Sequence, residues 1–166
     1  MGRTMFGTLK SLISSLADDA RSPDQSESRT CRLATAALLM RVATVDGEMS
    51  EARLRKLHAV VKARFALDDQ ATARLIDEAA AADRGAVDLY HFTRQLNGAL
   101  DDEGRRQVVR MMWEVILVDG RATDSESNIV WRAADLLAVP ARQRIELRQR
   151  IAAGGAAPAG CLPTGR

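Results

Sequence analysis

The chain has 166 residues, of which 46% are hydrophobic, 28% charged and 4% aromatic. This length suits one domain, and the composition excludes a wholly disordered chain. Lysine and arginine number 24 against 22 aspartate and glutamate, a near-balance that argues against a dedicated nucleic-acid binder. No apolar run reaches the roughly 20 residues of a transmembrane helix. Two cysteines, Cys31 and Cys161, are too few for a disulfide scaffold or a cysteine-based zinc site.

The first 17 residues predict an N-terminal amphipathic helix. Lys10 interrupts the apolar stretch and no small-residue cleavage site follows, so the segment is a poor signal peptide. Two interpretations are open: the helix docks on the domain, or it makes weak, reversible contact with a membrane surface. In either case the contacting residues recur at helical spacing, at Phe6, Leu9, Leu12, Ile13 and Leu16.

Two polar or small-residue segments delimit the domain. Residues 18–29 contain Pro23 and are typical of a linker. Residues 153–166 are rich in Gly, Ala and Pro and predict a disordered tail. Residues 30–152 carry no alternating strand pattern, and helix caps such as Asp68 and Asp101 recur along them. We expect about seven helices there.

An internal repeat organises this domain. Val45-Asp46-Gly47 recurs 73 residues later as Val118-Asp119-Gly120. In each copy a strongly apolar helix ends in Val-Asp-Gly, and a short loop leads to an amphipathic helix. The first helices, over residues 33–45 and 111–118, are apolar nearly all round and should be central. The sequence therefore predicts an all-α fold, a compact bundle of about seven helices built from two pseudo-symmetric helical hairpins, plus the N-terminal amphipathic helix.

Two charges occupy equivalent positions inside the apolar helices, Arg41 and Glu114. A buried charge without a partner is costly, so one hypothesis is that they meet near the pseudo-axis. The other is that each points to an end or edge of the bundle and stays solvated. Leu54 is expected on the inner face of its amphipathic helix, and Tyr90 in the core.

The loops after the two Val-Asp-Gly motifs are acidic. Residues 46–53 and 119–126 each carry three acidic residues and one arginine. A hard cation such as Ca²⁺ or Mg²⁺ takes carboxylate and carbonyl oxygens from a tight loop, although the ligand spacing here is not that of an EF-hand. The candidate metal ligands are Asp119, Glu126, Asp124, Asp46, Glu48 and Glu51.

Helix capping explains most of the same residues without a metal. Gly47 and Gly120 fit the left-handed position that ends a helix, and Ser50 fits the next N-cap. Thr123-x-x-Glu126 is a complete capping box, worth about 1 kcal/mol. In the first loop Arg53 stands at the matching position, so the box there is incomplete. Metal binding and helix capping are therefore two open explanations of the acidic loop residues.

The repeat resembles the TerB family, which is named for tellurite resistance and belongs to bacterial stress systems. The resemblance extends over roughly residues 30–151. It is carried by VATVDGEMSEA (42–52), DLYHFTRQLN (88–97), LDDEGRR (100–106), and above all by MMWEVILVDG (111–120) followed by VWRAADLLAV (130–139).

This resemblance implies a compact bundle of two pseudo-symmetric hairpins, acidic loops that are candidate divalent-cation sites, and binding or scaffolding proteins rather than enzymes. Asp119 and Glu126 match the second Asp-Gly…Glu motif completely. The first motif has Asp46, but Arg53 stands where the family pattern has Glu. A first-loop cation site would then need Glu48 or Glu51 as a substitute.

The sequence carries no recognisable catalytic motif. His58 and His91 belong to no His-Glu-x-x-His motif, and neither a phosphate loop nor a Gly-x-Ser-x-Gly elbow occurs. We therefore predict a non-catalytic, cytoplasmic binding or scaffolding module with a protein partner, no nucleic acid, and acidic loops that bind a divalent cation (Ca²⁺ or Mg²⁺). The alternative is a metal-independent structural adaptor that contacts the inner membrane surface or a protein partner.

Overall fold

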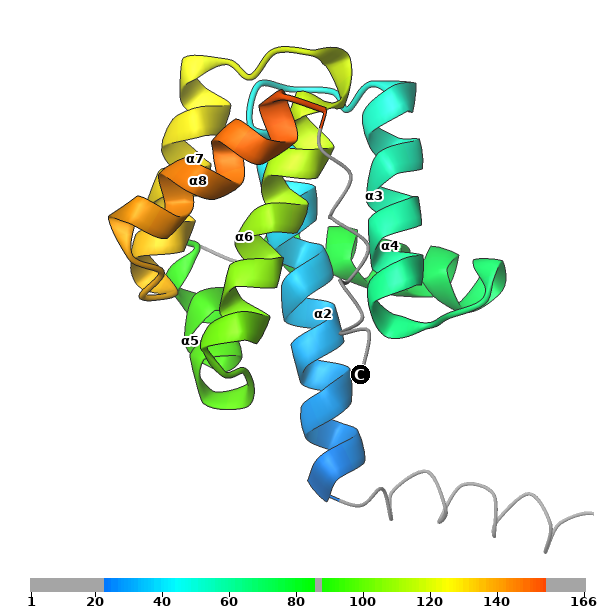
Figure 1. Cartoon of the computed structure of the whole chain (residues 1–166). Coiled ribbons are helices and arrows are strands. Elements are labelled where there is room, and N and C mark those ends of the chain that lie inside the picture. The colour runs from blue at the N-terminus through cyan, green and yellow to red at the C-terminus, as the bar shows by residue number, and fades with distance from the viewer. Residues whose placement is uncertain (1–22, 86–87, 155–166) are drawn as a thin grey trace, which may run out of the picture.

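Seven α-helices and one short 3-10 helix make up the part of the chain that the computed structural model describes, residues 23–85 and 88–154, and no strand occurs there (Figure 1). No helix within these ranges is long and apolar enough to cross a membrane. The elements in chain order are α2 (Pro23–Thr44), α3 (Glu51–Phe65), α4 (Asp69–Gly85), α5 (Tyr90–Ala99), α6 (Asp102–Ile116), η1 (Leu117–Asp119), α7 (Asp124–Leu136) and α8 (Ala141–Ala152). The all-α bundle predicted from the sequence is confirmed.

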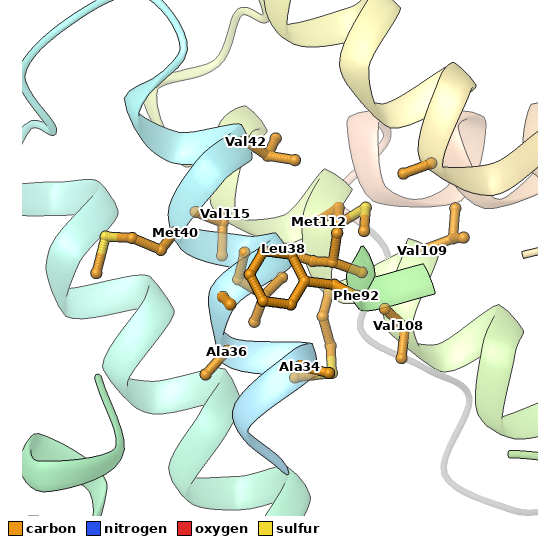
Figure 2. Close-up of a cluster of buried hydrophobic side chains, with 14 of the residues drawn as sticks. Ala34, Ala36, Leu38, Met40, Val42, Phe92, Val108, Val109, Met112 and Val115 are labelled. Carbon is orange, nitrogen blue, oxygen red and sulfur yellow. The ribbon is translucent and has the colours of Figure 1, made fainter. Parts of the chain in front are cut away.

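Helices α2 and α6 lie side by side at the centre, and the remaining helices surround them (Figure 1). Their inner faces are fully buried, with Leu39 of α2 and Met112 and Trp113 of α6 all at 0% exposure. Small side chains such as Ala36 let neighbouring helices approach α2 closely, and Figure 2 shows how larger apolar side chains fill the space around them. The two helices that end in Val-Asp-Gly are therefore the core of the bundle, as their all-round apolar sequences predicted.

Side-chain caps set the starts of α4 and α6 where the sequence placed them. The carboxylate of Asp68 accepts a hydrogen bond from the Ala71 N–H at 2.6 Å, and that of Asp101 accepts one from the Gly104 N–H at 2.8 Å. Both satisfy backbone donors that a helix N-terminus otherwise leaves free. The chain turns out of the two central helices at Gly47 and Gly120, whose φ angles of 120° and 85° favour glycine.

The linker prediction for residues 18–29 is wrong in its second half, because α2 begins at Pro23. Proline is tolerated in the first turn of a helix, where its missing N–H would have no partner anyway, and the long apolar helix that follows extends back to it. The predicted N-terminal helix over residues 1–17, with its Phe6-to-Leu16 stripe, lies outside the described residues. So does most of the predicted tail, since the description ends at residue 154.

The hypothesis that Arg41 and Glu114 pair with each other is also wrong. Arg41 Nε lies 2.6 Å from a carboxylate oxygen of Asp83 on α4. Glu114 is paired with Arg110 of its own helix at 2.8 Å and with Lys56 of α3 at 3.8 Å. Each central helix turns its charge toward a different outer helix, where both charges of each pair are only partly buried.

Two apolar side chains lie closer to solvent than expected. Leu54 is 46% exposed and Tyr90 is 57% exposed, although both were expected to face inward. Each stands in the first turn of its helix, α3 and α5. Leu89 and Phe92 beside Tyr90 are buried, so Tyr90 lies on the outer face of α5. Spacing along the sequence marks an apolar face but does not show how far that face is covered.

Replacing Leu39 by alanine should lower the free energy of unfolding by about 3 kcal/mol, because a fully buried side chain leaves a cavity. The control, Leu54→Ala, deletes the same atoms from a half-exposed position and should cost less than about 1 kcal/mol. Urea denaturation followed by circular dichroism measures both values. Equal losses in the two variants would contradict this packing.

Candidate functional site

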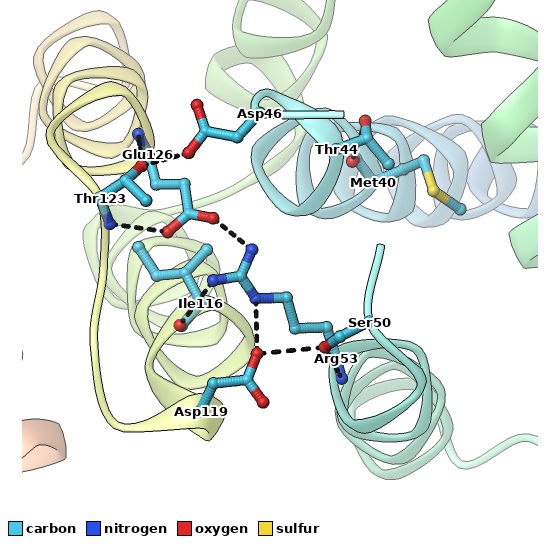
Figure 3. A network of polar contacts seen from close by, with 9 residues as sticks. All are labelled: Met40, Thr44, Asp46, Ser50, Arg53, Ile116, Asp119, Thr123 and Glu126. Carbon is cyan, nitrogen blue, oxygen red and sulfur yellow. Dashed lines mark hydrogen bonds and ion pairs between the residues drawn. The ribbon is translucent and has the colours of Figure 1, made fainter. Parts of the chain in front are cut away.

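The two acidic loops lie at the same end of the molecule and are hydrogen-bonded to each other (Figures 1 and 3). The hydroxyl of Ser50 donates to Oδ2 of Asp119 at 3.1 Å. The hydroxyl of Thr123 donates in turn to Oδ2 of Asp46. Each helix N-cap thus bonds the aspartate of the opposite loop, so the contact between the loops is reciprocal.

Arg53 lies across this contact. Its Nη1 donates to Oε1 of Glu126, and its Nε lies 3.2 Å from Oδ2 of Asp119, an ion pair outside hydrogen-bond angles. Its Nη2 donates to the carbonyl oxygen of Ile116 at 3.4 Å. The guanidinium therefore joins α3 to the end of α6, to η1 and to α7 at once (Figure 3). We call the group formed by Asp46, Ser50, Arg53, Asp119, Thr123 and Glu126 the loop junction.

Glu126 is the most deeply buried charge of the junction, with 1% of its side chain exposed. Its Oε2 accepts a hydrogen bond from the Thr123 N–H at 2.9 Å, while the Glu126 N–H donates to the Thr123 hydroxyl at 3.1 Å. This is the capping box that the sequence predicted. A carboxylate so far from water requires a counter-charge, which Arg53, itself 13% exposed, supplies.

The position of Arg53 in its own helix explains why it reaches across. It is the third residue of α3, as Glu126 is the third residue of α7, and its backbone N–H donates to the Ser50 hydroxyl at 3.2 Å. An arginine has no acceptor atom, so it cannot return the bond to the N-cap as a glutamate does. A positive charge is also unfavourable near a helix N-terminus. Ion pairs with the opposite loop compensate for both.

A family model described as tellurite resistance protein TerB matches residues 32–149. The chain belongs to the TerB family. No curated protein and no solved structure gives a match. The matched range includes both acidic loops and the whole loop junction, so the family resemblance inferred from the repeat is confirmed.

The six acidic residues predicted as metal ligands fall into two groups in this TerB domain. Asp46, Asp119 and Glu126 meet in the loop junction. The other three, Glu48, Glu51 and Asp124, are exposed, and Glu51 lies 3.6 Å from Arg55 on its own helix.

Sequence reasoning missed that the caps Ser50 and Thr123 bond across the loops and that Arg53 is the centre of the site. One signal in the sequence was present, but it also marked Arg41 and Glu114, which do not meet. Arg53 and Glu126 are 73 residues apart, the offset of the repeat, and so place opposite charges at equivalent positions.

The cation site that the TerB resemblance implies at Asp119 and Glu126 does not fit the residues present. Calcium needs about six to eight oxygen ligands and magnesium about six. Both oxygens of Glu126 already accept hydrogen bonds, and Oδ2 of Asp119 is shared by Ser50 and Arg53. Across the described ranges, no group of three or more His, Cys, Asp or Glu side chains is arranged to hold a metal ion.

A double-mutant cycle tests the pair at the centre of the junction. Arg53→Met leaves the Glu126 carboxylate buried without a counter-charge and should cost about 3–5 kcal/mol. Adding Glu126→Gln removes that charge while keeping an oxygen for the Thr123 N–H. The double variant should therefore be more stable than the sum of the two losses predicts, by at least about 1.5 kcal/mol.

The control cycle uses the exposed pair of Glu51 and Arg55 on the same helix, replaced by Gln and Met. Their side chains are 84% and 74% exposed, so we expect a coupling below about 0.5 kcal/mol. Urea denaturation of the wild type and the six variants gives both coupling energies. Additive losses at Arg53 and Glu126 would show that the buried pair contributes nothing of its own.

Proposed function

We propose that this TerB-family protein is a non-catalytic binding or scaffolding module of a bacterial stress response, and that the end carrying the acidic loops is its interaction surface. The observation that carries the proposal is the reciprocal bonding of the loops, which holds their carboxylates together as one surface. The exposed members of that surface are Asp46, Glu48, Glu51, Asp119 and Asp124.

The arrangement of the acidic surface supports binding rather than catalysis. The loop junction uses its charged groups in ion pairs and caps, and so leaves neither Glu126 nor Arg53 available for proton transfer to a substrate. A small hollow of about 80 Å³ between the start of α6 and the turn from α7 to α8 is lined in part by Asp102 and Arg105, which are paired with each other. The centre of the domain is filled by apolar side chains.

The chemistry of the surface indicates the kind of partner. Exposed carboxylates around a rigid junction favour a protein with lysine or arginine side chains, because complementary charge steers association and fixes orientation. We place this interaction in the cytoplasm. The helix predicted over residues 1–17, which lies outside the described residues, would add a second contact, with the inner membrane surface. Its contacting residues would be Phe6, Leu9, Leu12, Ile13 and Leu16.

A divalent cation bound to the same carboxylates is the second candidate function. The gathering of five exposed carboxylates at one end favours it, since carboxylate oxygens are ligands that Ca²⁺ and Mg²⁺ prefer. The guanidinium of Arg53 weighs against it at Asp119 and Glu126, where it already supplies positive charge. We therefore favour the metal-independent module.

Charge reversal at the acidic surface should abolish partner capture. A double variant, Glu48→Lys with Asp124→Lys, changes one exposed residue in each loop without touching the loop junction. Proteins captured from the native host by the tagged wild-type chain should be recovered at least about tenfold less by this variant, as like charges then face the partner. Quantitative mass spectrometry of the eluates is the readout.

The matched control is Asp77→Lys with Glu78→Lys on α4, an equal charge change. Glu78 is paired with Arg29, toward the opposite end of α2 from the loops, in an exposed contact that contributes little to stability. This variant should capture the same proteins as the wild type. If the loop variant and the control retain partners equally, the acidic loops are not the interaction surface.

A further inference from the structure

The loop junction contains a permanent positive charge at the point where carboxylates from two helices converge. Arg53 contacts Glu126 on α7 and Asp119 on η1, and both of these side chains belong to the second loop. With a glutamate at position 53, three carboxylates would converge there without any balancing charge. Like charges at such distances repel each other, most strongly at Glu126, whose side chain is 1% exposed, so an arrangement of that kind favours a bound cation.

We infer that the guanidinium of Arg53 is the resident cation of the loop junction, so that the two loops assemble without a divalent metal ion. The planar guanidinium donates hydrogen bonds to Glu126 and to the Ile116 carbonyl, and its Nε forms an ion pair with Asp119. A metal ion would need those same oxygens and would lie against a fixed positive charge. This inference concerns how the acidic surface is held together and does not depend on which partner the surface binds.

Arg53→Glu replaces the positive charge by a carboxylate at the third residue of α3, the position that Glu126 occupies in α7. The variant should become dependent on a divalent cation for the stability of the junction. Its thermal midpoint in EDTA should fall by roughly 10 °C, and millimolar Ca²⁺ should restore several degrees in a saturable manner.

The wild-type chain and two further variants are measured under the same conditions at constant ionic strength. The wild-type midpoint should be equal in EDTA, Ca²⁺ and Mg²⁺. Arg55→Glu makes the same charge change on a side chain that is 74% exposed, and its midpoint should fall by less than about 3 °C with no saturable response to Ca²⁺. Arg53→Gln removes the resident charge without adding a ligand, so its midpoint should fall and stay insensitive to cations.

Several results would overturn the inference. A wild-type midpoint that rises saturably with Ca²⁺ or Mg²⁺, with amide shifts in NMR spectra between Asp119 and Glu126, would show that the junction binds a metal beside Arg53. An Arg53→Gln variant as stable as the wild type would show that no resident charge is needed. An Arg53→Glu variant that stays equally unstable, or unfolded, at every cation concentration would refute the predicted gain of metal dependence.

Discussion

The burial of the Glu126 carboxylate is the constraint on which the loop end of this molecule depends. With 1% of its side chain exposed, this group cannot rely on water for its charge. The Thr123 N–H provides one hydrogen bond and the Arg53 guanidinium provides the counter-charge. Arg53 belongs to the first hairpin and Glu126 to the second. The counter-charge that Glu126 requires therefore fixes the distance between α3 and α7, which are far apart in the sequence.

The hydroxyl groups extend this constraint to both loops. Ser50 and Thr123 each begin a helix by accepting a backbone N–H, and each donates its own proton to an aspartate of the other loop. One hydroxyl therefore satisfies a helix terminus and joins the loops at the same time. The left-handed turns at Gly47 and Gly120 bring the chain to this geometry directly after the central helices. Local capping and the tertiary contact are thus made by the same atoms.

Those local features could be predicted from the sequence, and the contacts between loops could not. The caps Ser50 and Thr123 follow from rules about a residue and its own helix. Which atoms their hydroxyls donate to depends on how α2 packs against α6, and the repeat alone does not give that. The offset of 73 residues identified equivalent positions correctly. It did not show that Arg53 and Glu126 lie at the contact, while Arg41 and Glu114 face different outer helices.

The charge at position 53 decides how the two loops can stay together. Two glutamates at the third positions of α3 and α7 would each complete a capping box and would each bring a negative charge to the contact. Here only Glu126 completes its box, and α3 gives up the reciprocal bond at Ser50 in exchange for an ion pair across the junction. The cost is one hydrogen bond at the start of α3, worth about 1 kcal/mol, and the gain is a counter-charge that cannot dissociate from the protein. Acidic loops that meet in this way can be balanced by a bound cation or by an arginine of the chain, and the contacts of Arg53 correspond to the second arrangement.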